Sequence, residues 1–331
     1  MTASGIDSAS PPAPSHSATS AGETLAGLSG RDFLASTDLS ADEVRALMDL
    51  AAGLKAGDCR IDLSGRMLGL VFSKASTRTR VSFSVAMARL GGQTIDLLPI
   101  VTQVGRGEPI ADTARVLSRY CDALAIRTFD QADLVNYAHW ATIPVINALT
   151  DLEHPCQALA DFHTLRESFG SIEGLTMAYV GDGNNVAHSL MLVGAMLGVN
   201  VRVGCPQGFD PSPEILAKAT ELAAGRCKVA VLHDPVQTVR GAHALYTDVW
   251  ASMGQEAEQQ EREKAFAGWC LDETLLSEAE SRAIVLHCLP AHRGEEISAG
   301  VIEGFASRVF DQAENRLHAQ QALLAALLGA A

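Results

Sequence analysis

The hydrophobic positions in the first half of the chain form short apolar runs separated by stretches of helical periodicity. The runs predict strands at 67–72, 94–98, 123–127 and 143–147, and the stretches between them predict helices near 80–90, 110–120 and 131–138. Capping signals add a helix from 36–40 to Gly53, and a longer helix is predicted from Cys156 to Phe169. Strand and helix therefore alternate through this half.

The second half repeats the alternation. Leu175–Val180 predicts a strand, and a helix follows it up to Gly198. Further strands are predicted at 200–204, 228–232, 244–247, 283–287 and 308–311, an exposed loop or short helix at 251–264, and an Ala/Leu/Gln helix at 317–328. Uniformly apolar strands separated by helices predict an α/β fold of two doubly wound parallel-sheet domains, with a cleft between them.

Composition narrows the class of protein. A chain of 331 residues with 47% hydrophobic content can bury two cores, and its apolar runs are interrupted before they reach membrane-spanning length. The formal net charge of −14 argues against a nucleic-acid partner. Seven cysteines without paired spacing indicate reduced thiols. We therefore expect a cytoplasmic protein with no nucleic-acid and no membrane partner.

The first 25 residues are rich in Ser, Ala and Pro, which predicts a disordered tail. This tail has no apolar segment of the kind that a secretory signal carries. It contains no Lys or Arg, since the first of the chain is Arg31, and it contains the acids Asp7 and Glu23, so it does not have the composition of a transit peptide.

Residues 76–80, Ser-Thr-Arg-Thr-Arg, stand where a predicted strand ends and a helix begins. The unpaired N–H groups and the positive end of the helix dipole at such a junction attract anions. Three hydroxyls and two guanidiniums add directional donors suited to phosphate. The alternative is a simple helix cap followed by two solvated arginines, but a cap needs one hydroxyl and three crowd this turn. The pattern favours an oxyanion site.

Other polar residues follow the ends of predicted strands, where ligands bind in open α/β sheets. Arg127 completes an apolar strand, and burying it without a ligand or partner is unfavourable. His154 and Gln157 begin the next helix three residues apart, so they share one face and are expected to point into the cleft. His154 alone is also compatible with a purely structural role.

Residues 181–185, Gly-Asp-Gly-Asn-Asn, could be part of a dinucleotide fingerprint, which makes a nicotinamide-dependent oxidoreductase the rival hypothesis. The third glycine and the acid after the next strand are absent, so this signal is weak. Asp248 is suited either to a substrate amine or to a helix cap. Cys288 is either an inert buried thiol or a polarised group in the cleft. No Cys/His spacing indicates a zinc site, and we expect no metal.

Taken together, these segments resemble the transcarbamylase family, and within it the ornithine-using branch. The matching motifs are Ser76–Arg80, His154–Gln157, Asp248 with Ser252-Met253-Gly254, and His287–Pro290. They occur in the family's order from about residue 30 to the end of the chain. Ser252-Met253-Gly254 together with Cys288 distinguishes the ornithine branch and argues against N-acetylornithine or aspartate as acceptor.

The resemblance implies a fold, an activity and an assembly. It implies a carbamoyl phosphate-binding domain at 26–165, an ornithine-binding domain at 166–312, and a C-terminal helix at 313–331 that packs back on the first domain. The implied reaction transfers the carbamoyl group of carbamoyl phosphate to the δ-amine of L-ornithine, without a cofactor or a covalent enzyme intermediate. The family assembles as homotrimers or multiples of trimers with active sites at subunit contacts. A ligand-binding protein without activity is the remaining alternative.

The resemblance also implies roles residue by residue. Ser76, Thr77, Arg78 and Thr79 would hold the phosphate, with Arg316 completing the anion site and Gln103 reaching in across a subunit contact. Arg127 and His154 would bind the carbonyl oxygen, and Gln157 the carbamoyl NH₂. Asn185, Asp248, Ser252 and Met253 would bind ornithine, while Cys288 and Leu289 would line the reacting centre. The catalytic set implied is Arg127, His154, Cys288 and Thr79. Ser73 and Ser84 depart from acids common in relatives, at positions that bind no ligand.

Overall fold

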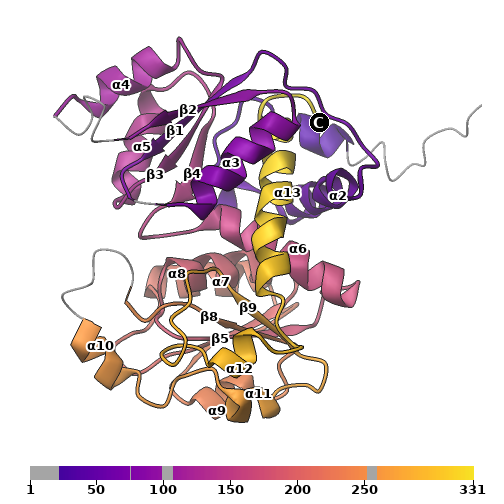
Figure 1. Cartoon of the computed structure of the whole chain (residues 1–331), viewed down its shortest axis with the longest axis vertical. Coiled ribbons are helices and arrows are strands. Elements are labelled where there is room, and N and C mark those ends of the chain that lie inside the picture. The colour runs from indigo at the N-terminus through magenta and orange to yellow at the C-terminus, as the bar shows by residue number, and fades with distance from the viewer. Residues whose placement is uncertain (1–21, 75, 99–106, 252–258) are drawn as a thin grey trace, which may run out of the picture.

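The computed structural model describes residues 22–74, 76–98, 107–251 and 259–331. Two α/β halves lie one above the other along the long axis of the molecule (Figure 1). Each half contains one parallel sheet, in the orders β2-β1-β3-β4 and β7-β6-β5-β8-β9. The predicted fold class is confirmed.

The first half is built from short strands and the helices that cover them. Its strands are β1 (Met67–Phe72), β2 (Gln93–Leu97), β3 (Ala123–Arg127) and β4 (Val145–Leu149). Its other elements are η1 (Ser36–Asp38), α2 (Ala41–Ala56), α3 (Arg78–Arg89), α4 (Ile110–Leu117) and α5 (Gln131–Trp140). Ser40 begins α2 through a capping box with Glu43, as the capping signal indicated, and Gly57 ends it in the left-handed conformation.

The second half is also built from short strands and the helices that cover them. Its strands are β5 (Thr176–Val180), β6 (Asn200–Gly204), β7 (Val229–Leu232), β8 (Ala244–Thr247) and β9 (Ile284–His287). Its helices are α7 (Asn185–Leu197), α8 (Pro213–Ala223), α9 (Pro235–Val239), α10 (Gln259–Ala265), α11 (Glu273–Ser277) and α12 (Ala299–Ile302). No helix among the described residues is long and apolar enough to cross a membrane.

Strand order reverses once in each sheet, beside β1 in the first and beside β5 in the second. At such a point the loops leave neighbouring strands in opposite directions and open a crevice at the carboxyl ends. The loops after β1 and β3 belong to one crevice, and those after β5 and β8 belong to the other. These loops carry most of the residues that the sequence singled out.

Two helices join the halves: α6 (Pro155–Phe169) and α13 (Val309–Leu327). α13 runs from the second half to the first, packing against α6, α2 and α3 (Figure 1). One apolar cluster continues from Leu70 in β1 through Phe162 and Leu324 to Tyr179 in β5. The halves therefore share a core instead of meeting only at a surface.

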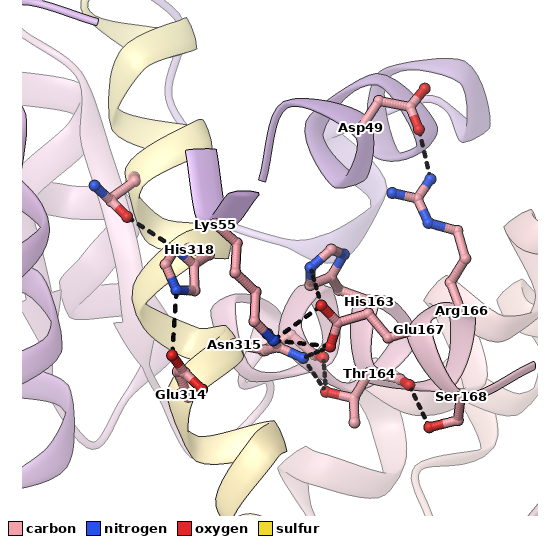
Figure 2. Close-up of polar contacts among 12 residues, drawn as sticks. Asp49, Lys55, His163, Thr164, Arg166, Glu167, Ser168, Glu314, Asn315 and His318 are labelled. Atoms are coloured by element: carbon pink, nitrogen blue, oxygen red, sulfur yellow. Dashed lines mark hydrogen bonds and ion pairs between the residues drawn. The ribbon is translucent and has the colours of Figure 1, made fainter. Parts of the chain in front are cut away.

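Polar contacts fix α13 where it crosses α6 and α2 (Figure 2). The Lys55 ammonium donates to Glu167 at 2.9 Å and to the Asn315 side-chain oxygen at 2.8 Å. The Asn315 amide donates in turn to Thr164 Oγ1 at 2.9 Å and to Glu167 Oε2 at 2.6 Å. Residues of three helices thus meet around the buried amide of Asn315.

Two expectations about elements were wrong in detail. The strand predicted at 308–311 is the start of α13, which begins eight residues before the predicted 317; Ser307 makes only a single bridge to Val285. Residues 22–25 of the predicted tail are helical and Leu25 is buried, whereas residues 1–21 lie outside the described part. The predicted domain boundary at 165/166 lies within α6 and stays a prediction.

Candidate active site

A cavity of about 860 Å³ lies between the halves at the carboxyl ends of the strands. Residues of both halves line it. The predicted site residues among them are Ser76, Thr77, Arg78, Thr79, Arg127, His154, Asn185, Asp248, Cys288, Leu289 and Arg316. Gln103, Ser252 and Met253 lie outside the described residues, and Gln157 does not line the cavity.

The end of the cavity predicted to bind an anion is the first turn of α3. Ser76 Oγ accepts from the Thr79 N–H at 3.3 Å, so Ser76 closes this turn. Arg78 lines the cavity, whereas Arg80 turns to the outside and pairs with Asp96 at 2.9 Å. Residues two positions apart point in directions about 200° apart around a helix, so only one of the Arg78 and Arg80 guanidiniums can face the cavity.

Three guanidiniums meet at this end. Burial and the nearby charges of Arg316 and Arg78 lower the pKa of Arg127 to about 10. Burial also lowers the pKa of Arg316, whose Nη2 donates to Thr79 Oγ1 at 2.5 Å. A bound anion would relieve the mutual repulsion and the desolvation of these guanidiniums, so the cluster is suited to an anion.

His154 stands at the start of α6 with its backbone N–H donating to Ser189 Oγ at 2.9 Å. Burial, and then the charges of Arg316 and Arg127, hold the pKa of this imidazole well below its usual value. The ring is therefore neutral at physiological pH. Its Nδ1 is buried with no hydrogen-bond partner among the described residues. A neutral imidazole in this place can donate one hydrogen bond to a developing oxyanion.

Gln157 lies one turn further along α6, behind the cavity wall. Its Nε2 donates to Asp161 Oδ1 at 2.8 Å, and its Oε1 is buried with no partner in the part of the chain that the structure describes. A carboxylate oxygen accepts hydrogen bonds, which leaves Oε1 as the atom free to accept from a ligand NH₂. The contact with a carbamoyl NH₂ stays a prediction.

The other end of the cavity is organised by Asp248, which is 6% exposed. Its carboxylate accepts from Asn184 Nδ2 at 3.0 Å, from the Cys288 thiol at 2.9 Å and from the Val249 N–H at 2.8 Å. The helix-cap alternative for Asp248 fails, because the described residues after it, 249–251, are not helical. The carboxylate faces the cavity and can bind a cation there.

Cys288 is a protonated thiol. Burial first, and then the Asp248 carboxylate, raise the pKa of Cys288 well above its usual value. A thiol in this state donates a hydrogen bond and is a poor nucleophile. Asn185 has a different part: its Nδ2 donates to the Thr150 carbonyl at 2.6 Å, tying the start of α7 to the loop after β4.

The structure also brings in residues that sequence reasoning missed. Lys74 lines the cavity, pairs with Asp151, and lies 4.0 Å above the Phe129 ring. Arg262, in the segment predicted as exposed, is buried and donates to Asp182 at 2.7 Å. Lys74 lies just past a strand end and could have been found by that rule. Arg262 could not, because its partner is 80 positions away.

The dinucleotide alternative does not fit the loop after β5. A Cβ at Gly183 would stand 2.2 Å from the Pro211 backbone nitrogen, so close packing of the protein's own chain explains this glycine. Asn184 Oδ1 accepts from the Val186 and Ala187 N–H groups, so the start of α7 is already capped. A pyrophosphate would compete with that cap.

Three groups of possible metal ligands among the described residues have members in the cavity wall, and the most buried of them is Asp248, His287 and Cys288, whose ligand atoms lie within 4.8 Å of one another. Each of these atoms is engaged. His287 Nδ1 accepts from the Leu289 N–H at 2.9 Å, and the thiol keeps its proton. A metal would have to displace these contacts, so the group is better suited to hydrogen bonding than to ligation.

Comparisons with known proteins match both halves. The models of the aspartate/ornithine carbamoyltransferase carbamoyl-P binding domain and Asp/Orn binding domain match residues 31–167 and 173–327. An ornithine carbamoyltransferase of Parasynechococcus marenigrum is 72% identical over 305 residues, covering 92% of this chain and 96% of that protein. One from Thermosynechococcus vestitus is 62% identical over 301 residues, covering 91% of this chain and 97% of its own.

Solved structures match as well. The ornithine carbamoyltransferase of Pyrococcus furiosus superposes with a TM-score of 0.88 at 49% identity, covering 92% of this chain and 99% of that one. The enzyme from Gloeobacter violaceus gives 0.83 at 55% identity, covering 90% and 98%.

Proposed function

The chain belongs to the aspartate/ornithine carbamoyltransferase family, and from this premise we propose that it transfers the carbamoyl group of carbamoyl phosphate to the δ-amine of L-ornithine. The products are L-citrulline and phosphate. The observation that carries the proposal is the arrangement of charge in one cavity: three guanidiniums at one end and the Asp248–Cys288 pair at the other. An anionic donor and a cationic acceptor fit these ends.

At the donor end, the phosphate is held by Ser76, Thr77, Arg78 and Thr79 with Arg316 behind them. The α3 N-terminus adds its N–H groups and dipole. Gln103 is proposed to complete the phosphate site from a neighbouring subunit. Residues 26–165 form the carbamoyl phosphate-binding domain in this proposal, and residues 166–312 the ornithine-binding domain.

At the reacting centre, Arg127, His154 and Thr79 stabilise the carbonyl oxygen as negative charge develops on it. Removing one such donor typically lowers kcat about 10²–10³-fold. The δ-amine attacks the carbamoyl carbon directly, the tetrahedral species expels phosphate, and the departing phosphate accepts the amine proton. Gln157 Oε1 accepts from the carbamoyl NH₂, which distinguishes this group from an acyl group without N–H donors.

At the acceptor end, Asp248 binds the α-ammonium of ornithine, assisted by Asn185, Ser252 and Met253. The δ-amine must lose its proton before attack, since a free alkyl amine has a pKa of about 10. The guanidiniums near the carbamoyl group disfavour a charged amine there. The Cys288 thiol and the Leu289 segment line this place. We also propose that the reaction uses neither a metal nor a cofactor.

We also propose a homotrimer, or a multiple of trimers, in the cytoplasm. The side chains of Val81 and Val85 on α3 and of Ile95 on β2, which packs against α3, are exposed. Exposed apolar groups of this kind suit a subunit contact. All seven cysteines are thiols, which suits a reducing compartment.

The decisive experiment measures citrulline formation from carbamoyl phosphate with ornithine, beside aspartate and N-acetylornithine. Activity is expected with ornithine alone. Arg78→Ala should abolish it, while Arg80→Ala is the matched control from the same turn that points away from the cavity and should keep most of it. Transfer to a different amine would overturn the Asp248 half of the proposal. No transfer from folded protein would overturn all of it.

A further inference from the structure

The segment that follows β9 has an unusual backbone at the cavity wall. Leu289 adopts a φ of +58°, in the left-handed region that residues with a Cβ rarely occupy. Cys288, Leu289 and Pro290 all line the cavity at this turn. Some contact must hold Leu289 in this conformation, because nothing in its own side chain favours it.

The contact is a buried relay behind the wall. The Leu289 N–H donates to His287 Nδ1 at 2.9 Å, and His287 Nε2 meets Glu296 Oε1 at 3.0 Å. An N–H that donates to Nδ1 requires this nitrogen to carry no proton, so the imidazole proton is on Nε2 and points to the carboxylate. Both contacts are satisfied by one tautomer.

Glu296 is placed as an anchor for this tautomer. Its side chain and that of His287 are almost completely buried. Oε1 also accepts from the His292 N–H at 2.6 Å, which ties the far end of the same loop to the same atom. Oε2 is buried with no hydrogen-bond partner among the described residues. Burying a carboxylate with one oxygen unpaired costs folding free energy. The contacts that Oε1 makes are the reason we infer for its presence here.

His287 is fixed from a second side. Its backbone N–H donates to Gln312 Oε1 at 2.8 Å, and Gln312 Nε2 donates to Asp161 Oδ1 at 2.7 Å. The backbone of His287 is therefore held by α13 and α6, while its ring is held by Glu296. Only the ring contact reaches Leu289.

We propose that Glu296 is a positioning residue, which acts through the His287 ring to hold the Leu289 backbone at the cavity wall. This inference rests on the proposed carbamoyl transfer, because it assigns the wall at Cys288 and Leu289 to the reacting centre. Glu296 touches no reactant. Its effect is on the placement of the reacting groups, where an error of about 1 Å can cost 10²-fold in rate.

The test separates geometry from charge with two variants. Glu296→Gln keeps an Oε1 acceptor in place and loses the charge, and Glu296→Asp keeps the charge and withdraws the acceptor by one methylene. We expect E296Q to retain kcat within about threefold and E296D to lose at least tenfold. A role of the negative charge predicts the reverse order, and that order would overturn the proposal, as would wild-type kcat in E296D.

A second readout excludes general damage. Binding of inorganic phosphate depends on the α3 end of the cavity, so its Kd should stay within about twofold in E296D while kcat falls. A crystal structure of E296D should show Leu289 outside the left-handed region. If kcat falls while Leu289 keeps the φ that it has in the wild type, Glu296 does not act through the Leu289 backbone, and the proposal is contradicted.

If E296D does not fold, two variants of His287 decide the question. Asparagine places an amide oxygen near the Nδ1 position and can still accept from the Leu289 N–H, whereas glutamine reaches only toward Nε2. His287→Asn should therefore retain more activity than His287→Gln by about tenfold, and equal losses overturn the proposal. Wild-type citrulline formation is measured first: its absence rejects the function, whereas its presence with insensitive variants rejects the relay alone.

Discussion

Asp161 is a completely buried carboxylate that receives hydrogen bonds from Gln157 and Gln312. Burial raises its pKa from the usual 3.8 to about 7, against the lowering effect of these hydrogen bonds. The folded state thus holds this proton more tightly than the unfolded state. Its contribution to stability is complete below about pH 4 and is lost as pH rises to about 7.

Asp161→Asn keeps an acceptor oxygen for both glutamines and cannot lose a proton. We expect the variant to gain stability relative to the wild type by up to about 4 kcal/mol between pH 4 and pH 7, and no more above it. Urea unfolding at a series of pH values measures this difference. The exposed Glu221→Gln serves as control and should show no such trend. A difference independent of pH would show that Asp161 is ionised throughout.

His154 gives a prediction about the pH dependence of activity. Its pKa is lowered, so the neutral donor is present through the neutral range and is lost only when the pH falls below that lowered value. We expect His154→Ala to reduce kcat about 10²–10³-fold, by the same factor at pH 6 and pH 8. Steady-state rates of both proteins across this range test it. If the ratio of wild-type kcat to variant kcat is much smaller at pH 6 than at pH 8, the imidazole titrates near its usual pKa.

At this scale the sequence identified where site residues lie better than what they contact. The Ser76–Arg80 motif could be placed because the strand before it and the helix after it are local patterns. That Arg80 points outward depends on the residue at which α3 begins. The hydrogen bond from Gln312 to Asp161 could not be predicted, because Gln312 is 151 positions from Asp161 and is brought there only by the return of α13.

Helix α13 is held to α6 and α2 by the amide of Asn315, which is completely buried (Figure 2). Asn315→Ala removes three hydrogen-bond partners at once and leaves Lys55, Thr164 and Glu167 to rearrange. We expect a loss of about 1–3 kcal/mol in the free energy of unfolding, seen as a lower urea midpoint with an unchanged m-value.

The matched control for this element is Lys218→Ala, which breaks an exposed ion pair with Glu221 on α8. It should change the unfolding free energy by less than about 0.5 kcal/mol. Equal effects of the two changes would mean that the polar junction adds nothing beyond a surface pair, and that apolar packing alone docks α13.

The strand predictions failed at residues 308–311 and shifted at residues 143–147. Residues 308–311 include Val309 and Phe310, which read as the start of a strand, yet Phe310 is 61% exposed and Val309 alone is buried, as on a helix. The strand predicted at 143–147 begins at Val145. Pro144 cannot donate to a sheet, and this signal was available in the sequence.

The fold as a whole followed from the alternation of strand and helix, because a parallel sheet needs a covering crossover after each strand. The cavity followed from the same rule, since both switch points open on the carboxyl side. The one shared core did not follow. The shared core depends on α6 and α13 passing between the halves. The hydrophobic pattern of a helix predicts which of its faces is buried but not which helix packs against that face.

The whole molecule is proposed to be a trimer whose sites use Gln103 from one subunit and Arg78 from the next. This arrangement predicts complementation between two inactive proteins. Arg78→Ala and Gln103→Ala are each expected to be inactive alone. When equal amounts are unfolded together and reassembled, every mixed trimer contains one interface where both residues are wild type, because a cyclic trimer presents each pairing in a fixed direction.

Random assembly then places about three quarters of the protein in mixed trimers with one working site in three, so about a quarter of the wild-type rate should return. The control is each variant unfolded and reassembled by itself, which should stay inactive. Mixing Arg78→Ala with His154→Ala is the negative control: Arg78 and His154 line the same cavity of one chain, and no subunit in this mixture supplies both. That second mixture should stay inactive, and recovery in it, or none in the first, contradicts a site divided between subunits at Gln103.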